Sequence, residues 1–151
     1  MNIEQRNRIV SIVLIVVILF LGYWLYVTIT GPWQEVQRER AMTEQVRENM
    51  MAVNEAIRFY NEHNNRFPVA LDSLFVFITN NERFMSNPDS VLRNRRFDPD
   101  TFFLSPRTGN RFEYALNDSA RPPLYMISDP DTDDRIGTLD RVTDRGAPSW
   151  R

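Results

Sequence analysis

The side chains of this chain best suited to chemistry are carboxylates near the C-terminus. Asp129, Asp131 and Asp133 stand at alternate positions, and Asp140 is the twelfth residue counted from Asp129. Alternating carboxylates in a twelve-residue loop are typical of calcium sites, but position six of such loops is glycine and here it is Asp134. A calcium site at these four aspartates is one hypothesis, and an acidic surface turn is the other. No other cofactor is expected.

A second charged group is the arginine cluster Arg93, Arg95 and Arg96. It lies in a polar stretch, residues 79–99, that contains several Asn and Pro turn signals. Guanidinium groups bind carboxylates and phosphates through paired hydrogen bonds, so the cluster is a candidate site for an acidic partner. The alternative is three solvated charges with no binding role.

The remaining inventory argues against an enzyme. The chain has no Cys, all 18 of its basic residues are Arg, and its single histidine, His63, lies in a polar turn without a nearby nucleophile. Thiolate, Schiff-base and multi-histidine metal chemistry are therefore excluded within one chain. A formal net charge of −2 gives no basic surface for nucleic acid, so no nucleic-acid partner is expected.

The strongest pattern is an uncharged run of 21 residues, Ile9–Ile29. As a helix it is about 31 Å long, close to the hydrocarbon thickness of a bilayer. Secretory signal sequences have apolar regions of about 7–15 residues and end at small residues, whereas this run carries Tyr23, Trp24 and Tyr26 near its C-terminal end. The pattern predicts a transmembrane helix with membrane lipid as a partner, and it favours an uncleaved chain.

Orientation depends on the flanking arginines. Arg6 and Arg8 adjoin the run, while the first arginine after it is Arg38. The positive-inside rule therefore favours a cytoplasmic N-terminus. We expect an inner-membrane protein with its C-terminal domain in the periplasm.

Thr30-Gly31-Pro32 is expected to bend or interrupt the helix, and residues 33–64 are expected to form an amphipathic one. An apolar stripe with steps of four and three residues marks one helix face: Val46, Met50, Val53, Ile57 and Tyr60. We expect this stripe to pack on the chain's own sheet. Pairing with a coiled-coil partner is the alternative, although it needs more heptads than are present.

The rest of the chain predicts a small α+β domain. A short helix is expected at Leu71–Ile78, a long surface loop at 79–99, and three antiparallel strands at 101–104, 111–116 and 124–128. The tail is expected to be loop, with its few apolar side chains as anchors: Ile136, Leu139 and Trp150. The expected division is a cytoplasmic segment 1–8, a membrane helix 9–29, an α+β domain 30–128 and an acidic tail 129–151.

Two segments in order resemble type IV pilins and the pseudopilins of type II secretion. The first comprises Ile57–Tyr60, Asn64–Pro68 and Leu71–Leu74, and the second is the turn and strand Ser105–Tyr114. The N-terminus departs from those families, because residues 1–8 contain no glycine for prepilin-peptidase cleavage. The resemblance implies a pilin-like domain on an ordinary membrane anchor.

These observations together predict a non-enzymatic single-pass membrane protein that serves as a structural or interaction subunit of a secretion or motility assembly. Its partners would be other membrane or envelope proteins, as a homo- or hetero-oligomer. Two alternatives stay open at this point. One is an accessory subunit of a respiratory or photosynthetic membrane complex, and the other is a periplasmic ligand-sensing domain.

Overall fold

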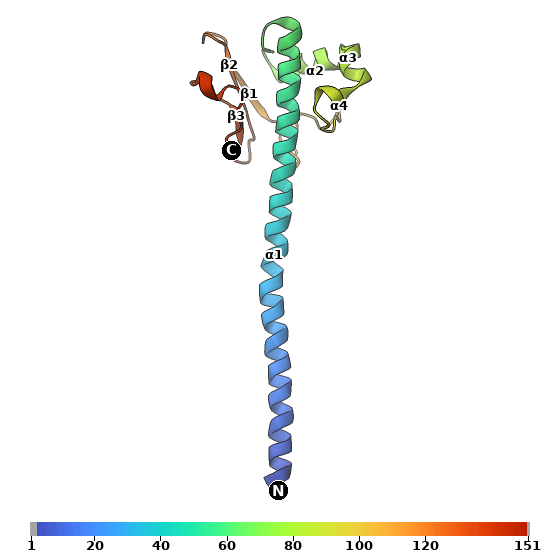
Figure 1. Cartoon of the computed structure of the whole chain (residues 1–151), viewed down its shortest axis with the longest axis vertical. Coiled ribbons are helices and arrows are strands. Elements are labelled where there is room, and N and C mark those ends of the chain that lie inside the picture. Colours follow the sequence, from blue (N-terminus) through green and yellow to red (C-terminus); the bar gives the residue numbers. More distant parts are fainter. Residues whose placement is uncertain (1–2, 151) are drawn as a thin grey trace. The chain divides into compact units, whose positions relative to one another are not determined.

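The computed structural model describes the backbone of residues 3–150, and within that range the side chains of all residues except 3 and 30–32. The chain divides into two compact units, one ending at Ala41 and the other beginning at Met42. The fold is α+β, as expected, and Figure 1 shows its elements in order. The helices are α1 (Ile3–Asn64), α2 (Leu71–Asn80), α3 (Glu82–Ser86), α4 (Pro88–Val91) and a 3-10 turn, η1 (Val142–Asp144). The strands are β1 (Glu113–Asn117), β2 (Leu124–Ser128) and β3 (Arg135–Gly137).

The expected interruption at residues 30–32 is wrong, because α1 is assigned as one continuous helix through them. Proline lacks only its own N–H, so Pro32 removes a single hydrogen bond, the one to the carbonyl of Thr28. The bonds of the neighbouring turns remain, and the helical assignment persists. A helix boundary predicted from proline alone is therefore misplaced here.

The C-terminal end of α1 lies where the sequence predicts it. The helix ends at Asn64, and Asn65 has a left-handed backbone with φ of 51° and donates its N–H to the Asn61 carbonyl at 2.8 Å. Asparagine tolerates this conformation better than most residues. The second expected helix is also present, and its inner side buries Leu71, Leu74 and Ile78.

The long surface loop expected at 79–99 is wrong in its first part, which contains α3 and α4. Each helix begins at an asparagine whose side chain accepts a backbone N–H: Asn81 from Phe84 at 3.0 Å and Asn87 from Ser90 at 3.2 Å. Pro88 occupies the first turn of α4, where its missing N–H costs nothing. The asparagines and the proline that suggested turns are helix starts in this segment.

The sheet has the order β1-β2-β3 and is antiparallel throughout. β1 and β2 correspond to expected strands, whereas the expected strand at 101–104 is a turn with one bridge, Leu104 to Arg111. β3 lies in the tail that we expected to be loop. Its outer edge is covered by the C-terminal segment, since Gly137 N–H donates to Ala147 and Ser149 N–H donates to Arg135, both at 2.8 Å.

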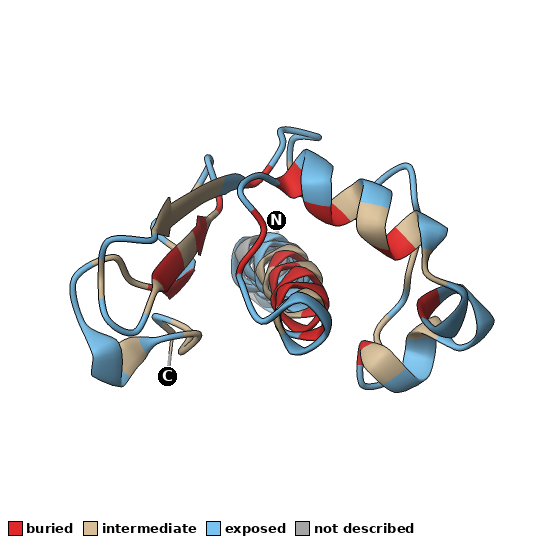
Figure 2. Ribbon diagram, turned by 90° about the horizontal axis from the view of Figure 1, so that it is seen from above, coloured by how far each residue is buried: buried red, intermediate tan, exposed pale blue. Residues whose placement is uncertain are grey.

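The second unit is built around the C-terminal half of α1. Figure 2 shows the sheet on one side of this helix and α2 with its neighbours on the other, with buried residues facing the helix. The expected stripe carries that contact, because Val46, Met50, Val53 and Ile57 are each at most 1% exposed and Tyr60 is partly buried. They pack in one core with residues of both sides, including Leu74, Phe84, Phe112, Ile127 and Ile136.

Candidate functional site

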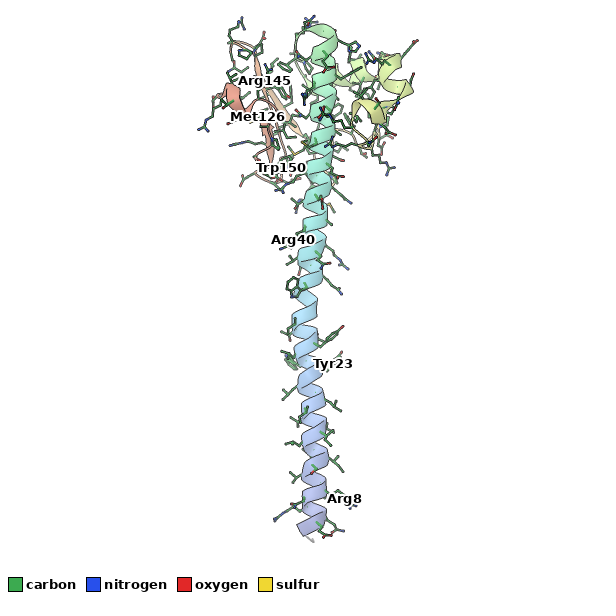
Figure 3. All side chains as sticks on the ribbon, viewed as in Figure 1. Arg8, Tyr23, Arg40, Met126, Arg145 and Trp150 are labelled. Atoms are coloured by element: carbon green, nitrogen blue, oxygen red, sulfur yellow. The ribbon has the colours of Figure 1, made fainter. Side chains whose placement is uncertain are left out.

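The first candidate site is the apolar run of α1. All large apolar side chains from Ile9 to Ile29 are exposed, by 46% to 70%. Tyr23 and Arg8 project from the helix in Figure 3, as do the side chains between them. The helix is long and apolar enough to cross a membrane, and its most apolar stretch is not buried anywhere in the described chain. A core helix of a soluble domain has most of that surface covered by its own chain.

The hydroxyl of Thr28 in this run is satisfied within the helix. Thr28 donates its hydroxyl to the Trp24 carbonyl at 2.8 Å, one turn back. Phe20 and Trp24 stack edge to face with ring centroids 5.9 Å apart. A helix that satisfies its own hydrogen bonds and presents only apolar or amphipathic side chains is suited to lipid.

The apolar stripe of α1 from Val46 to Ile57 is not available to a partner. The contacts that would serve a coiled coil are used by the chain's own sheet and α2. The stripe is a packing face within the second unit, as the sequence favoured.

The four aspartates proposed for calcium have separate environments. Asp129 is 3% exposed and accepts a hydrogen bond from Thr132 at 2.9 Å, whereas the side chain of Asp131 accepts from Thr108 and Asn110. Asp133 and Asp140 are exposed. Within residues 3–150 no group of three or more His, Cys, Asp or Glu side chains is arranged to hold a metal ion. Calcium binding stays a prediction without a preformed ligand cage.

The acidic segment instead contributes structural contacts. Asp131 joins it to the turn at 105–110, and Asp134, which the sequence did not single out, joins it to α1. Arg47 donates two hydrogen bonds to Asp134, at 2.8 and 3.0 Å. The hydrogen bond that Arg47 donates to Asp134 raises the pKa of Arg47, so the guanidinium stays charged. Trp150 lies beside α1 in Figure 3, with its ring 5.1 Å from the Arg47 guanidinium carbon.

The three clustered arginines have three different surroundings. Arg93 pairs with Glu55 of α1, with Nε and Oε1 3.4 Å apart, and Arg95 donates to the Leu92 carbonyl at 3.3 Å. Arg96 is exposed and lines a cleft beside α1. The cluster therefore does not form one anion-binding group, and a role toward an acidic partner stays a prediction for each residue separately.

Arg93 is fixed in place by its ion pair with Glu55. The Glu55 side chain is 8% exposed, and Arg58 from the next helical turn is its second counter-charge at 3.7 Å. A buried carboxylate is tolerated when it is paired. Glu55 was missed in the sequence because a glutamate on a helix is usually solvated.

A buried polar pair, Asn54 and Tyr125, was also missed. The Tyr125 hydroxyl donates to the Asn54 side-chain oxygen at 2.7 Å. Burial raises the pKa of Tyr125 to about 12, although Arg58 and Arg145 oppose the rise. Burial likewise raises the pKa of Tyr114, whose hydroxyl donates to the Pro68 carbonyl. Asn54 could have been found, because it is a polar residue one turn from both Met50 and Ile57 on the buried face.

Comparison with protein families, with characterised proteins and with solved structures finds no match. What the chain shares with pilins is the order of its elements: a long N-terminal apolar helix, shorter helices and a small antiparallel sheet.

Proposed function

We propose that this chain is a non-enzymatic single-pass membrane protein whose C-terminal α+β domain binds other proteins within a cell-envelope assembly. The observation that carries the proposal is the uninterrupted exposure of apolar side chains from Ile9 to Ile29, next in the chain to a domain with a closed core of its own. Exposing apolar surface to water costs about 25 cal/mol per Å². An exposed apolar run of this length therefore requires a lipid or protein environment.

The proposed orientation is N-terminus in the cytoplasm and the second unit in the periplasm. Arg6 and Arg8 lie directly before the apolar run, and positive charge is retained on the cytoplasmic side. Tyr23, Trp24 and Tyr26 are then placed toward the outer membrane–water interface, where amphipathic rings are favoured.

A contact role is supported by the kind of polar groups that the domain contains. Arg47 with Asp134 and Asn54 with Tyr125 are pairs of buried or half-buried polar side chains engaged in structural contacts. The pilin-like order of elements supports a secretion or motility assembly as the setting. In such an assembly the membrane helix would orient the domain and concentrate it near its partners.

Membrane anchoring is tested on full-length protein expressed in a Gram-negative cell. Membranes are washed with alkaline carbonate, and the N-terminus of the retained protein is sequenced. We expect retention with residues 9–29 still present. Release by carbonate, or a mature chain that starts after Gly31, would overturn the anchor.

Topology and partners are tested separately. Because the chain has no Cys, a cysteine introduced by Ser149→Cys is a unique label, and a membrane-impermeant maleimide should label it in intact spheroplasts. A matched cysteine from Asn7→Cys should react only after lysis. Mild cross-linking before detergent extraction should then recover envelope proteins with the chain, and a chain recovered only as a monomer contradicts the assembly role.

A further inference from the structure

A cleft of about 580 Å³ lies on the second unit between α1 and the segment that connects α4 to β1. Gln45, Glu48 and Asn49 line it from α1. The other wall comes from the connecting segment: Arg96, Asp98, Thr101, Phe102, Leu104, Ser105, Pro106 and Gly109. The volume falls within the range of about 300–1,000 Å³ that is usual for small-ligand pockets.

Four polar side chains that line this cleft have no partner within the described chain, and three of them, Gln45, Glu48 and Arg96, are exposed. The side chains of Gln45, Glu48, Asn49 and Arg96 make no hydrogen bond or ion pair with any other described residue. The adjacent carboxylate of Asp98, in contrast, accepts from the Asp100 backbone and the Thr101 hydroxyl. The unpaired groups are thus one carboxylate, one guanidinium and two amides.

A residue with a buried hydroxyl, Ser105, also lines this cleft. Ser105 is 1% exposed, and its Oγ has no hydrogen-bond partner among the described residues. A buried hydroxyl without a partner costs free energy, so such groups are rare in folded proteins.

We propose that this cleft binds short peptides with free termini. Glu48 receives the α-ammonium group, and Arg96 binds the α-carboxylate through its planar fork of donors. The side-chain amides of Gln45 and Asn49 each offer a donor and an acceptor, which is the complement of a peptide group. The two charges come from opposite walls and do not pair with each other, as a ligand with separated opposite charges requires.

The proposed peptide binding does not depend on the proposed membrane anchoring, because every side chain that lines the cleft belongs to the second unit. Phe102 and Leu104 supply the apolar part of the lining, against which a ligand side chain can lie. Peptides of two or three residues fit the volume and carry the two terminal charges that the walls leave unmatched.

The test is isothermal titration of the full chain in detergent micelles with triglycine, N-acetyl-triglycine and triglycine amide. We expect saturable binding of triglycine and at least tenfold weaker binding of each blocked peptide. In Glu48→Gln, triglycine binds more weakly and N-acetylation causes no further loss. In Arg96→Gln, triglycine likewise binds more weakly, and C-terminal amidation causes no further loss. This crossed pattern assigns each terminus to one wall.

The controls are Glu44→Gln on the same helix and Arg66→Gln after it, both exposed, which should bind triglycine as the parent does. Ser105→Ala should weaken binding without lowering the thermal unfolding midpoint, because its hydroxyl makes no hydrogen bond within the described chain. Absence of saturable triglycine binding at millimolar concentration would overturn the proposal. So would equal sensitivity to both blocking groups in the two cleft variants when circular dichroism shows them folded.

Discussion

Arg47 on α1 and Asp134 in the C-terminal loop form a two-bond ion pair across 87 residues of sequence. The Arg47 side chain is 37% exposed and that of Asp134 is 13% exposed, so the pair is partly withdrawn from water. Trp150 packs over the same guanidinium. The acidic tail is thus an integral part of the second unit and is fixed to the helix that begins it.

Replacing Arg47 by Met should lower the free energy of unfolding by about 1–3 kcal/mol, because Asp134 is left mostly buried without its charged donor. Arg47→Lys keeps the positive charge but loses the paired hydrogen-bond geometry. Its free energy of unfolding should therefore lie between those of the parent protein and Arg47→Met. The matched control is Arg111→Gln, which breaks the exposed pair with Asp72 and should cost less than about 1 kcal/mol. Denaturant midpoints of the second unit's transition measure all three, and equal losses at Arg47 and Arg111 would contradict the role given to the pair.

The buried pair of Asn54 and Tyr125 should behave as a coupled unit. Tyr125→Phe leaves the Asn54 oxygen without its donor and should destabilise the fold by about 1–3 kcal/mol. Asn54→Leu removes the acceptor, and the double variant should be less destabilised than the sum of the single changes. A thermodynamic cycle from urea unfolding measures the coupling. Strict additivity would mean that the hydrogen bond contributes nothing.

The pKa of Tyr125 predicts a specific alkaline sensitivity. An unfolded tyrosine loses its proton near pH 10, while the folded Tyr125 keeps its proton up to about pH 12. The folded state therefore holds more protons in this window, and the free energy of unfolding decreases as pH rises from about 10 to 12. Below pH 10 this contribution is fully present. In Tyr125→Phe the free energy of unfolding should decrease less between about pH 10 and 12, and Tyr114 should account for the decrease that remains. An unchanged pH dependence in that variant would contradict the assignment of this sensitivity to Tyr125.

Periodicity predicted the elements that bury a continuous face. The stripe from Val46 to Ile57, the inner side of α2 and the strand Leu124–Ser128 all lie where the sequence placed them, because each contributes several apolar side chains at one spacing to one core. The asparagine end of α1 was predictable as well, since it depends on the backbone preference of one residue type.

The elements that the sequence did not predict have a common physical cause: they depend on contacts with residues that are distant in the chain. α3 and α4 are too short for periodicity; asparagine caps start both helices, and α3 buries Phe84 in the core. β3 exists because Ile136 adds to the core beside β2. The cleft beside Gln45 could not be predicted from the sequence, because its two walls lie far apart in the chain and each has the composition of ordinary polar surface.

Two glycines with similar backbones offer a final test of the sheet. Gly137 and Gly109 have φ of 81° and 76°, so alanine at either position is strained by about 1–2 kcal/mol. They differ in their surroundings. A Cβ at Gly109 meets no atom within 4 Å, whereas one at Gly137 collides with the Tyr125 carbonyl oxygen of the paired strand β2. That oxygen belongs to the sheet backbone and moves only if β2 and β3 separate.

Gly109→Ala should therefore show the backbone cost alone, and Gly137→Ala should lose clearly more stability and expose the β3 edge. Hydrogen exchange of the Gly137 and Ser149 amides, which form the hydrogen bonds between β3 and the C-terminal segment, should accelerate only in Gly137→Ala. If both variants unfold at the same denaturant concentration, the close approach of β3 to Tyr125 is not a feature of the folded protein in solution.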